Sequence, residues 1–203
     1  MRTVLFVAVV GLAASLFGMP AASQDAAGGE DLFGRGLKDW TRTGSGPTPW
    51  LLTADNVLVC GAGGSEQIAP ERVFGNGTLT FDYRFRVTGG AAGRRAALYV
   101  RRSPEGKGVR LDLGDDCGKL TATFTGSSDR EKTVESRPGQ TVAMPIGDWN
   151  TVEVVLDGRS VMVKVNGKPA SSVDQADPET GLIAIAAEGS ETEFRRMYWR
   201  EGK

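Results

Sequence analysis

Residues 147–167 read GDWNTVEVVLDGRSVMVKVNG, and their pattern gives the clearest indication of the fold. Aliphatic residues recur at every second position in 152–156 and again in 161–165. A period of two places alternate side chains on opposite faces of a β-strand. Asp157-Gly158 separates the two runs, and glycine readily adopts the positive φ that a tight hairpin turn requires. The stretch therefore predicts an antiparallel hairpin with one buried aliphatic face.

The same alternation recurs along the chain, whereas no helical periodicity extends beyond a turn or two. Further strands are predicted at residues 57–60, 78–87, 98–101, 109–113, 120–124, 182–187 and 193–200, and a loop at 171–179. With 28 glycines and 9 prolines among 203 residues, the chain is rich in turns. Many short strands separated by turns are typical of a β-sandwich or barrel. We therefore predict an all-β fold in which two antiparallel sheets bury their apolar faces against each other.

The N-terminus has the features of a secretory signal peptide. Residues 1–23 combine a basic start, an apolar segment over 4–19 and small residues before the expected cleavage point. That apolar segment is shorter than the roughly 20 residues that span a bilayer, and an uncleaved anchor is the alternative. We predict a signal peptide at 1–23, a flexible tail at 24–30 and one domain at 31–203. The mature protein is expected to be secreted or periplasmic.

The charges of the chain are evenly balanced. It has 24 basic and 25 acidic residues, which give a formal net charge of −1. Such a balance provides no broad basic field to attract nucleic acid or an anionic membrane. We therefore expect neither partner after removal of the signal peptide, and the oligomeric state is not predicted.

Three neighbouring carboxylates raise the question of a metal. Asp112, Asp115 and Asp116 offer the oxygen ligands that calcium prefers. Their spacing matches no calcium-binding loop, so a solvated acidic turn is the favoured interpretation. We predict no cofactor, with calcium or another divalent metal as the alternative.

The two cysteines, Cys60 and Cys117, allow two interpretations. In an oxidising compartment they could form a disulfide, which would stabilise the fold by about 4 kcal/mol in the chain-entropy model. Cys60 also ends an apolar strand, where a thiol packs as a small hydrophobic group. Both a disulfide between Cys60 and Cys117 and two separate buried thiols stay open from the sequence.

Four segments in order carry a resemblance to a known family. They read LFG followed by Trp40, DNVLVC at 55–60, GDWN at 147–150, and GLIA through EGS to FR over 181–195. Together they resemble the 3-keto-disaccharide hydrolase domain family of exported proteins, over essentially the whole mature chain. The resemblance implies a concanavalin-like jelly-roll sandwich and a saccharide ligand.

The resemblance also implies a reaction, the cleavage of a glycosidic bond next to a ketone at carbon 3. The ketone acidifies the neighbouring C–H bond, a general base removes that proton, and the leaving group departs by elimination. Such a site needs a base, a donor that polarises the carbonyl and an acid for the leaving oxygen. In the family these groups would project from the concave sheet.

The chain departs from the family pattern at the polar positions. The family reads NSGI-aromatic-LR where residues 95–101 read RAALYVR, and GYE-apolar-QI where residues 108–113 read GVRLDL. It reads LQ-any-HG where residues 185–189 read IAAEG, and the chain has no histidine, the usual base near neutral pH. Of these positions only Arg101 carries over. The resemblance therefore leaves two functions open, saccharide cleavage or a carbohydrate-binding module that has lost the catalytic residues.

Alternation also predicts which polar side chains leave the core, and if their strands are neighbours, these side chains form one patch. The candidate catalytic residues are Arg101, Asp112 and Glu188, and the candidate substrate-binding residues are Asp82, Arg84, Tyr99 and Arg110. Arg101 would anchor a sugar oxygen or the 3-keto group, and Asp112 or Glu188 would be the acceptor or base. Tyr99 would stack on a sugar ring. The alternative is a solvated sheet face with cross-strand ion pairs.

Overall fold

The computed structural model describes residues 28–44, 50–61, 66–87, 94–125 and 131–202. The predicted signal peptide, 1–23, lies outside these residues. Within them no helix occurs, and none therefore is long and apolar enough to cross a membrane. The N-terminal strand starts at Glu30, one residue before the predicted domain start.

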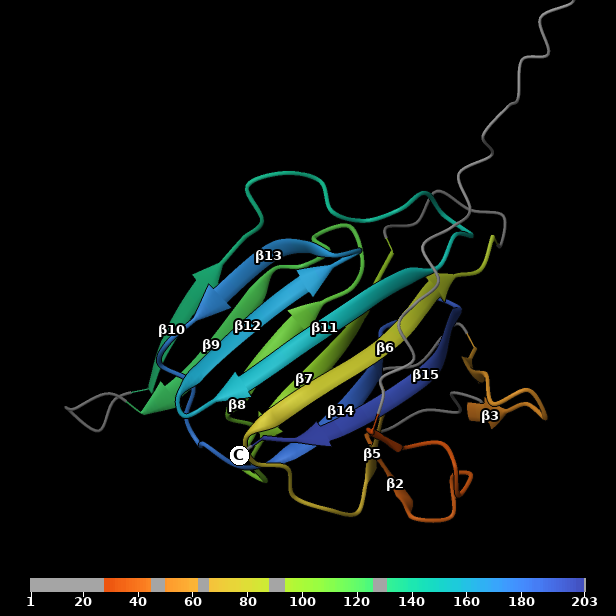
Figure 1. Ribbon diagram of the computed structural model, residues 1–203, viewed down its shortest axis with the longest axis horizontal. Coiled ribbons are helices and arrows are strands. Elements are labelled where there is room, and N and C mark those ends of the chain that lie inside the picture. Colours follow the sequence, from red (N-terminus) through yellow and green to blue (C-terminus); the bar gives the residue numbers. More distant parts are fainter. Residues whose placement is uncertain (1–27, 45–49, 62–65, 88–93, 126–130, 203) are drawn as a thin grey trace, which may run out of the picture.

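Two antiparallel sheets lie face to face, as the alternation predicted (Figure 1). The first sheet has the order β13 (Lys168–Val173), β12 (Ser160–Val165), β11 (Asn150–Asp157), β6 (Gly77–Phe85), β15 (Thr192–Glu201), β4 (Leu58–Cys60) and β3 (Trp50–Leu52), and β1 (Glu30–Asp31) pairs with β15. The second sheet has the order β10 (Glu131–Ser136), β9 (Leu120–Thr125), β8 (Gly108–Asp112), β7 (Ala96–Arg102), β14 (Leu182–Ala187), β5 (Gln67–Pro70) and β2 (Trp40–Thr43). In the view of Figure 1 the first sheet lies in front of the second.

The predicted hairpin is formed by β11 and β12, which pair from Val152 opposite Val165 to Asp157 opposite Ser160. Gly158 adopts the positive φ of 51° that the turn requires. The aliphatic face of both strands is buried against the second sheet, with Val152 at 0% and Val161 at 0% exposure. Each such fully buried side chain contributes about 1.5–3 kcal/mol relative to an exposed one. This face and its counterparts on β6, β7, β8, β14 and β15 make one core.

The loop prediction at 171–179 is wrong for its first residues, because β13 extends through Val173. Asn166 and Gly167 have positive φ and form a second tight turn, so the chain returns along β12 as a third strand. β13 reads KPASSV and lies at the edge of its sheet, mostly exposed. An edge strand with little aliphatic alternation gives no period-two signal.

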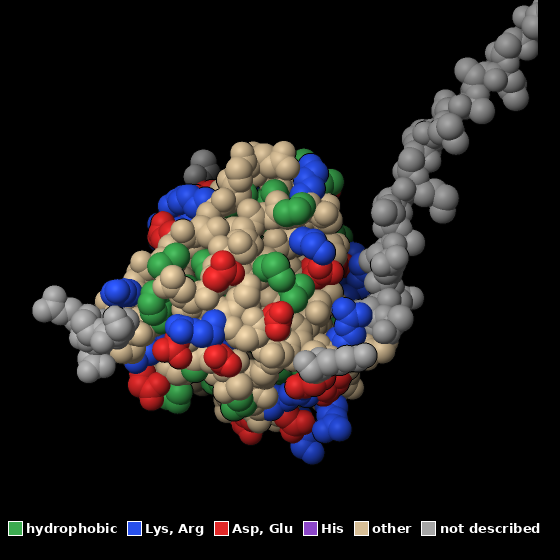
Figure 2. Space-filling view, turned by 60° about the vertical axis from the view of Figure 1, so that its left-hand side comes forward, with side chains coloured by type: hydrophobic (Ala, Val, Ile, Leu, Met, Phe, Trp, Pro, Cys, Tyr) green, Lys and Arg blue, Asp and Glu red, His purple; other side chains and the backbone are tan. Residues whose placement is uncertain are grey.

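The outer surface carries both signs of charge. Figure 2 shows basic and acidic side chains interspersed over one face, with hydrophobic side chains between them. This mixture agrees with the formal net charge of −1.

The two thiols are free, and the disulfide predicted as one alternative is not formed. The Cys60 thiol lies 3.9 Å from the backbone oxygen of Ser190, and the Cys117 sulfur lies 3.0 Å from the hydroxyl of Tyr83. Each cysteine thus has its own partner inside the fold. Burial raises the pKa of Cys60 to about 11 and also raises the pKa of Cys117. Both are therefore protonated thiols near neutral pH.

A thiol titration tests this arrangement. The purified protein, unfolded without reductant, is expected to react as two free thiols for each chain, because Cys60 and Cys117 have no bridge to break. In the native state both should react slowly, since both are buried. A count of zero in the unfolded protein would show that the bridge exists.

Candidate functional site

Four of the predicted site residues meet on the outer face of the second sheet. Tyr99 of β7 lies directly opposite Arg110 of β8, and Asp112 follows two residues later on the same face. Glu188 comes directly after β14, which pairs with the other edge of β7. The short connection between β7 and β8 makes these strands direct neighbours, which brings the side chains together.

Arg110 is the centre of this cluster. Its Nε and Nη2 donate to Asp112 Oδ1 at 2.9 and 2.5 Å, and Nη2 also donates to Glu188 Oε2 at 2.8 Å. Its Nη1 donates to Glu188 Oε1 and to the Tyr99 hydroxyl, the latter at 3.0 Å. These bonds use all the N–H groups that a guanidinium has. Arg110 therefore has no donor left for a ligand.

The electrostatics follow from this geometry. The hydrogen bonds of Glu188, and then those of Asp112 and Tyr99, raise the pKa of Arg110 further above its ordinary value, against the effect of burial. The guanidinium thus stays charged, and it holds both carboxylates in fixed orientations. What the cluster can offer a ligand is the remaining acceptor capacity of the carboxylate oxygens.

A hollow of about 350 Å³ lies beside the cluster, and we call it the site hollow. Its lining is charged and contains no aromatic ring: Arg94, Arg95, Ala96, Arg110, Asp112, Gly114, Asp115, Asp116 and Glu188. The volume is in the range of small-molecule sites. The charged lining suits a ligand rich in hydroxyl groups better than an apolar one.

Sequence reasoning named Asp115 only as a possible metal ligand and missed Arg94, and both line the site hollow. Arg94 and Asp115 form an ion pair there, with Arg94 Nη2 2.8 Å from Asp115 Oδ1. Gly114 allows the two segments to approach, because a Cβ at this position would lie 1.9 Å from the Arg94 backbone oxygen. Both charged residues lie outside the strands, where alternation makes no prediction.

Tyr99 contacts Arg110 and does not line the site hollow. Its hydroxyl accepts from Arg110, and the guanidinium carbon of Arg102 lies 4.5 Å from its ring centroid. The ring is therefore stacked with an arginine of its own strand. Stacking on a sugar, the role predicted for Tyr99, would require displacement of Arg102 or use of the other ring face.

The predicted outward position of Arg101 is wrong. Arg101 has a φ of 55° at an irregularity in the pairing of β7 with β14, and its side chain is 0% exposed. A bulge inserts one residue into the alternation, so Arg101 turns into the sandwich and Arg102 takes the outward place. There Arg101 Nη2 donates to Asn76 Oδ1 at 3.2 Å. Arg101 does not line the site hollow, and the direct role predicted for it has no geometric support.

Asp82 and Arg84 are also separated from the cluster. They lie on β6, which pairs with β11 and β15 of the first sheet and not with β7. Their side chains point away from the core on the opposite face of the sandwich. The predicted single patch is therefore wrong, because alternation shows which face a residue takes and not to which sheet its strand belongs.

The carboxylates of the acidic turn lie beside arginines. Among the described residues, no three histidine, cysteine, aspartate or glutamate side chains come together in a way that could hold a metal ion. Asp112 and Asp115 are engaged by Arg110 and Arg94. The arrangement is that of ion pairs between strands and loops.

Solved structures that share this fold include the following three. A "putative glycosyl hydrolase" from Parabacteroides distasonis is 19% identical, with a TM-score of 0.64 over 85% of this chain and 98% of that one. A carbohydrate-binding module from Bacillus subtilis is 12% identical, with a TM-score of 0.61 over 80% and 96%. The β-glucanase of Bacillus licheniformis is 10% identical, with a TM-score of 0.57 over 85% and 97%. At these identities the likeness establishes the fold alone, a jelly-roll sandwich as predicted.

The family assignment rests on the sequence over almost the whole described domain. The search of curated proteins finds no match. The model of the 3-keto-alpha-glucoside-1,2-lyase-like domain matches residues 28–200, the span that folds into the two sheets. The resemblance found in the sequence motifs is thereby confirmed, and the chain belongs to the family of 3-keto-alpha-glucoside-1,2-lyase-like domains.

Proposed function

We propose that this protein binds a saccharide in the site hollow without cleaving it. The proposal rests on one observation: all the N–H groups of the Arg110 guanidinium already donate hydrogen bonds to Asp112, Glu188 and Tyr99. Saturated in this way, Arg110 holds two carboxylates rigidly at the edge of a polar hollow. Fixed carboxylates accept hydrogen bonds from sugar hydroxyl groups, and charge-assisted bonds of this kind are stronger than neutral ones.

The same saturation argues against proton transfer. A general base must be free to accept a proton, whereas Asp112 and Glu188 are both ion-paired with one guanidinium. A 3-keto oxygen needs a donor, and Arg110 has none left. The chain also has no histidine. Membership of a saccharide-related family and the likeness to a carbohydrate-binding module support binding.

Cleavage next to a 3-keto group is the second candidate function, and the family match favours it. In this reading Arg94 or Arg95, which line the site hollow, would polarise the ketone, and Glu188 would act as the base after release from Arg110. In either case the predicted signal peptide supports a location outside the cytoplasm.

Calorimetric titration with a glycoside panel separates the two functions. The panel contains methyl glucosides, galactosides and xylosides, the corresponding disaccharides, and their 3-keto derivatives. We expect binding of at least one saccharide without release of products. Glu188→Gln should weaken that binding by about tenfold or more, which is about 1.4 kcal/mol or more, because the amide loses both the charge and part of the ion pair with Arg110.

Glu135→Gln is the matched control. Glu135 is also ion-paired, with Lys119 at 2.7 Å, but it does not line the site hollow. Its replacement should leave the affinity unchanged. Equal binding by Glu188→Gln and the wild type would place the site elsewhere. If the wild type released products and Glu188→Gln did not, the function would be cleavage and not binding alone.

A further inference from the structure

A second cluster of charges lies on the outer face of the first sheet, around Asp82. Asp82 is only 2% exposed, and its Oδ2 lies 3.1 Å from Arg195 Nε and 2.9 Å from Arg196 Nε. Thr151 donates to its other oxygen at 2.8 Å. Arg196 has a φ of 52° at an irregularity of β15, which puts two consecutive arginines on one face.

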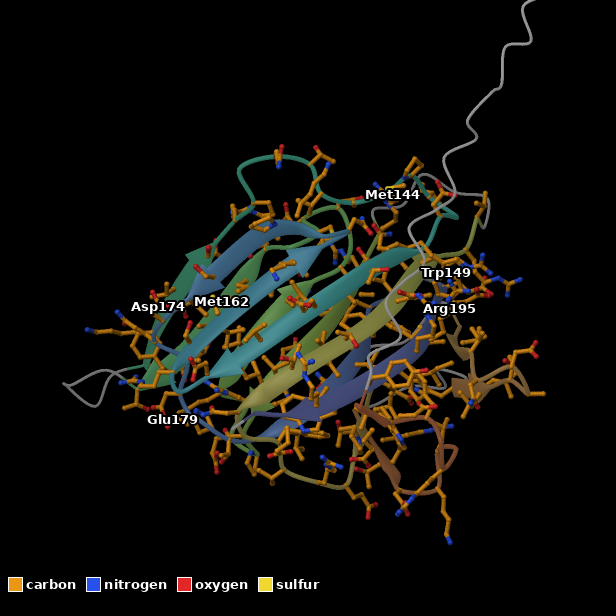
Figure 3. The ribbon with its side chains drawn as sticks, viewed as in Figure 1. Met144, Trp149, Met162, Asp174, Glu179 and Arg195 are labelled. Carbon is orange, nitrogen blue, oxygen red and sulfur yellow. The ribbon has the colours of Figure 1, made fainter. Side chains whose placement is uncertain are left out.

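Trp149 lies between arginines of this cluster. The guanidinium carbon of Arg195 lies 3.9 Å from its ring centroid, and that of Arg84 lies 4.4 Å away. Figure 3 shows Trp149 and Arg195 close together beside the first sheet. Stacking on the indole holds both guanidinium planes in place.

The arginines cover the carboxylates. We call Arg84, Arg86, Arg195 and Arg196 the arginine layer; their side chains are 34–50% exposed. The carboxylates below them, Asp82, Glu191 and Glu193, have side chains 3–20% exposed. Four positive groups therefore face the solvent above three negative ones. The exposed surface of the cluster is therefore cationic, although the net charge of its four arginines and three carboxylates is close to zero.

The outer ends of these arginines are available. Arg84, Arg195 and Arg196 each bind their carboxylate through Nε. Their Nη atoms have no hydrogen-bond partner among the described residues. Two Nη groups of one guanidinium form the fork that fits a carboxylate, sulfate or phosphate.

We propose that the arginine layer is a second binding site, for the anionic groups of an acidic polysaccharide. The position on the outer face of a sheet suits an extended polymer. The bordering residues Thr80 and Thr151 add hydroxyl groups that can bond to sugar hydroxyls. The buried ion pairs of Asp82 need not stabilise the fold, since buried ion pairs often contribute little to stability. Its effect here is to fix two guanidiniums side by side.

A lipid surface is the competing partner. Membrane docking of a folded face depends on apolar side chains that enter the bilayer interface as well as on attraction to anionic lipids. The strands around the arginine layer instead present Thr80, Thr151 and Glu153, although Val87 and Ile146 are exposed on nearby loops. The observations therefore favour the polysaccharide, and anionic vesicles enter the test as a separate arm.

The test uses affinity electrophoresis of the full mature protein in gels with polygalacturonate, dextran sulfate or neutral dextran. We expect retardation by one or both acidic polymers and not by dextran, and a loss of retardation at high salt. The whole chain has a formal net charge of −1, so its overall charge gives no general attraction to polyanions. The double variant Arg84→Gln/Arg195→Gln should lose at least about tenfold in affinity. It leaves Asp82 paired with Arg196 and Glu193 paired with Arg86, so that no carboxylate is left without an arginine.

Arg72→Gln is the matched control. Arg72 also pairs with a carboxylate, that of Glu30, also lies over an aromatic ring, that of Phe74, and its side chain is 36% exposed. Both Arg72→Gln and Glu188→Gln should be retarded like the wild type. Unchanged retardation of Glu188→Gln would show that the arginine layer binds independently of the site hollow. Wild-type protein that no acidic polymer retards, or a double variant that is retarded equally, overturns the proposal. Binding to phosphatidylglycerol vesicles through the same arginines, without retardation by the polymers, overturns it too.

Discussion

Replacement of Arg101 with alanine is expected to destabilise the protein by about 3–5 kcal/mol, because it removes a large buried side chain. Arg101 is the largest of the fully buried side chains, and its hydrogen bond to Asn76 connects β7 with the segment that precedes β6. Its removal leaves a void in the buried interior and breaks that connection. Burial lowers the pKa of Arg101, and the charges of Glu179 and Asp157 oppose this shift. Denaturation by urea, followed by fluorescence, measures the effect.

Arg101→Met distinguishes volume from charge. Methionine fills much of the same space, and it removes a charge that has no ion-pair partner among the described residues. Replacing a buried charge by an apolar side chain of similar size is often neutral or stabilising. We therefore expect Arg101→Met to stay within about 1.5 kcal/mol of the wild type. If Arg101→Ala were as stable as the wild type and failed only in ligand binding, the buried position of Arg101 would be contradicted.

Gly181→Ala is expected to destabilise the protein by about 3 kcal/mol or more. A Cβ at Gly181 would lie 2.4 Å from the backbone carbon of Arg101. Gly181 cannot move away freely, because it exchanges two backbone hydrogen bonds with Phe74, at 2.8 and 3.0 Å. The methyl group therefore either breaks this bridge or displaces the bulge at Arg101. Thermal and urea unfolding should both show the loss.

Gly139→Ala is the control for this substitution. A Cβ at Gly139 would meet no atom within 4 Å, and the residue is exposed. Its replacement should change stability by less than about 0.5 kcal/mol. Similar stabilities for Gly181→Ala and Gly139→Ala would show that the close approach of Gly181 to Arg101 does not exist in solution.

The sequence predicted the sandwich where one face of a strand is aliphatic and the other polar. β11 and β12 are the clearest case, because their alternation is continuous and a glycine turn joins them. The bulge at Arg101 could not be predicted, since a positive φ at an arginine carries no sequence signal such as glycine or asparagine. One such residue reversed the orientation of the candidate that the family pattern retains.

The candidate site could be predicted as far as local pairing determines it. Tyr99, Arg110 and Asp112 were placed together because a short connection joins their strands. The separation of Asp82 from them is a property of the sheet order, which depends on long-range contacts that alternation does not encode. The ion pair of Arg94 with Asp115 lies in connecting segments, for which the period of two has no meaning.

The residues that depart from the family pattern meet in the structure. Arg110, Asp112 and Glu188 stand where the resemblance leads us to expect glutamate, glutamine and histidine. They form one ion-paired cluster, with Arg110 bonded to both carboxylates. A glutamate, a glutamine and a histidine of the family pattern are thus replaced by a guanidinium between two carboxylates. This joint replacement fits a site that holds a sugar better than one that removes a proton.

The most direct test of the central claim is an NMR titration of the ¹⁵N-labelled protein with the saccharide that binds most tightly in the glycoside panel. We expect the amide signals of Ala96, Arg110, Asp112 and Gly114 to shift in proportion to occupancy, because these residues line the site hollow. Signals from β11 and β12, on the opposite sheet, should stay in place. Shifts confined to the first sheet, or none at saturating saccharide, would contradict the account.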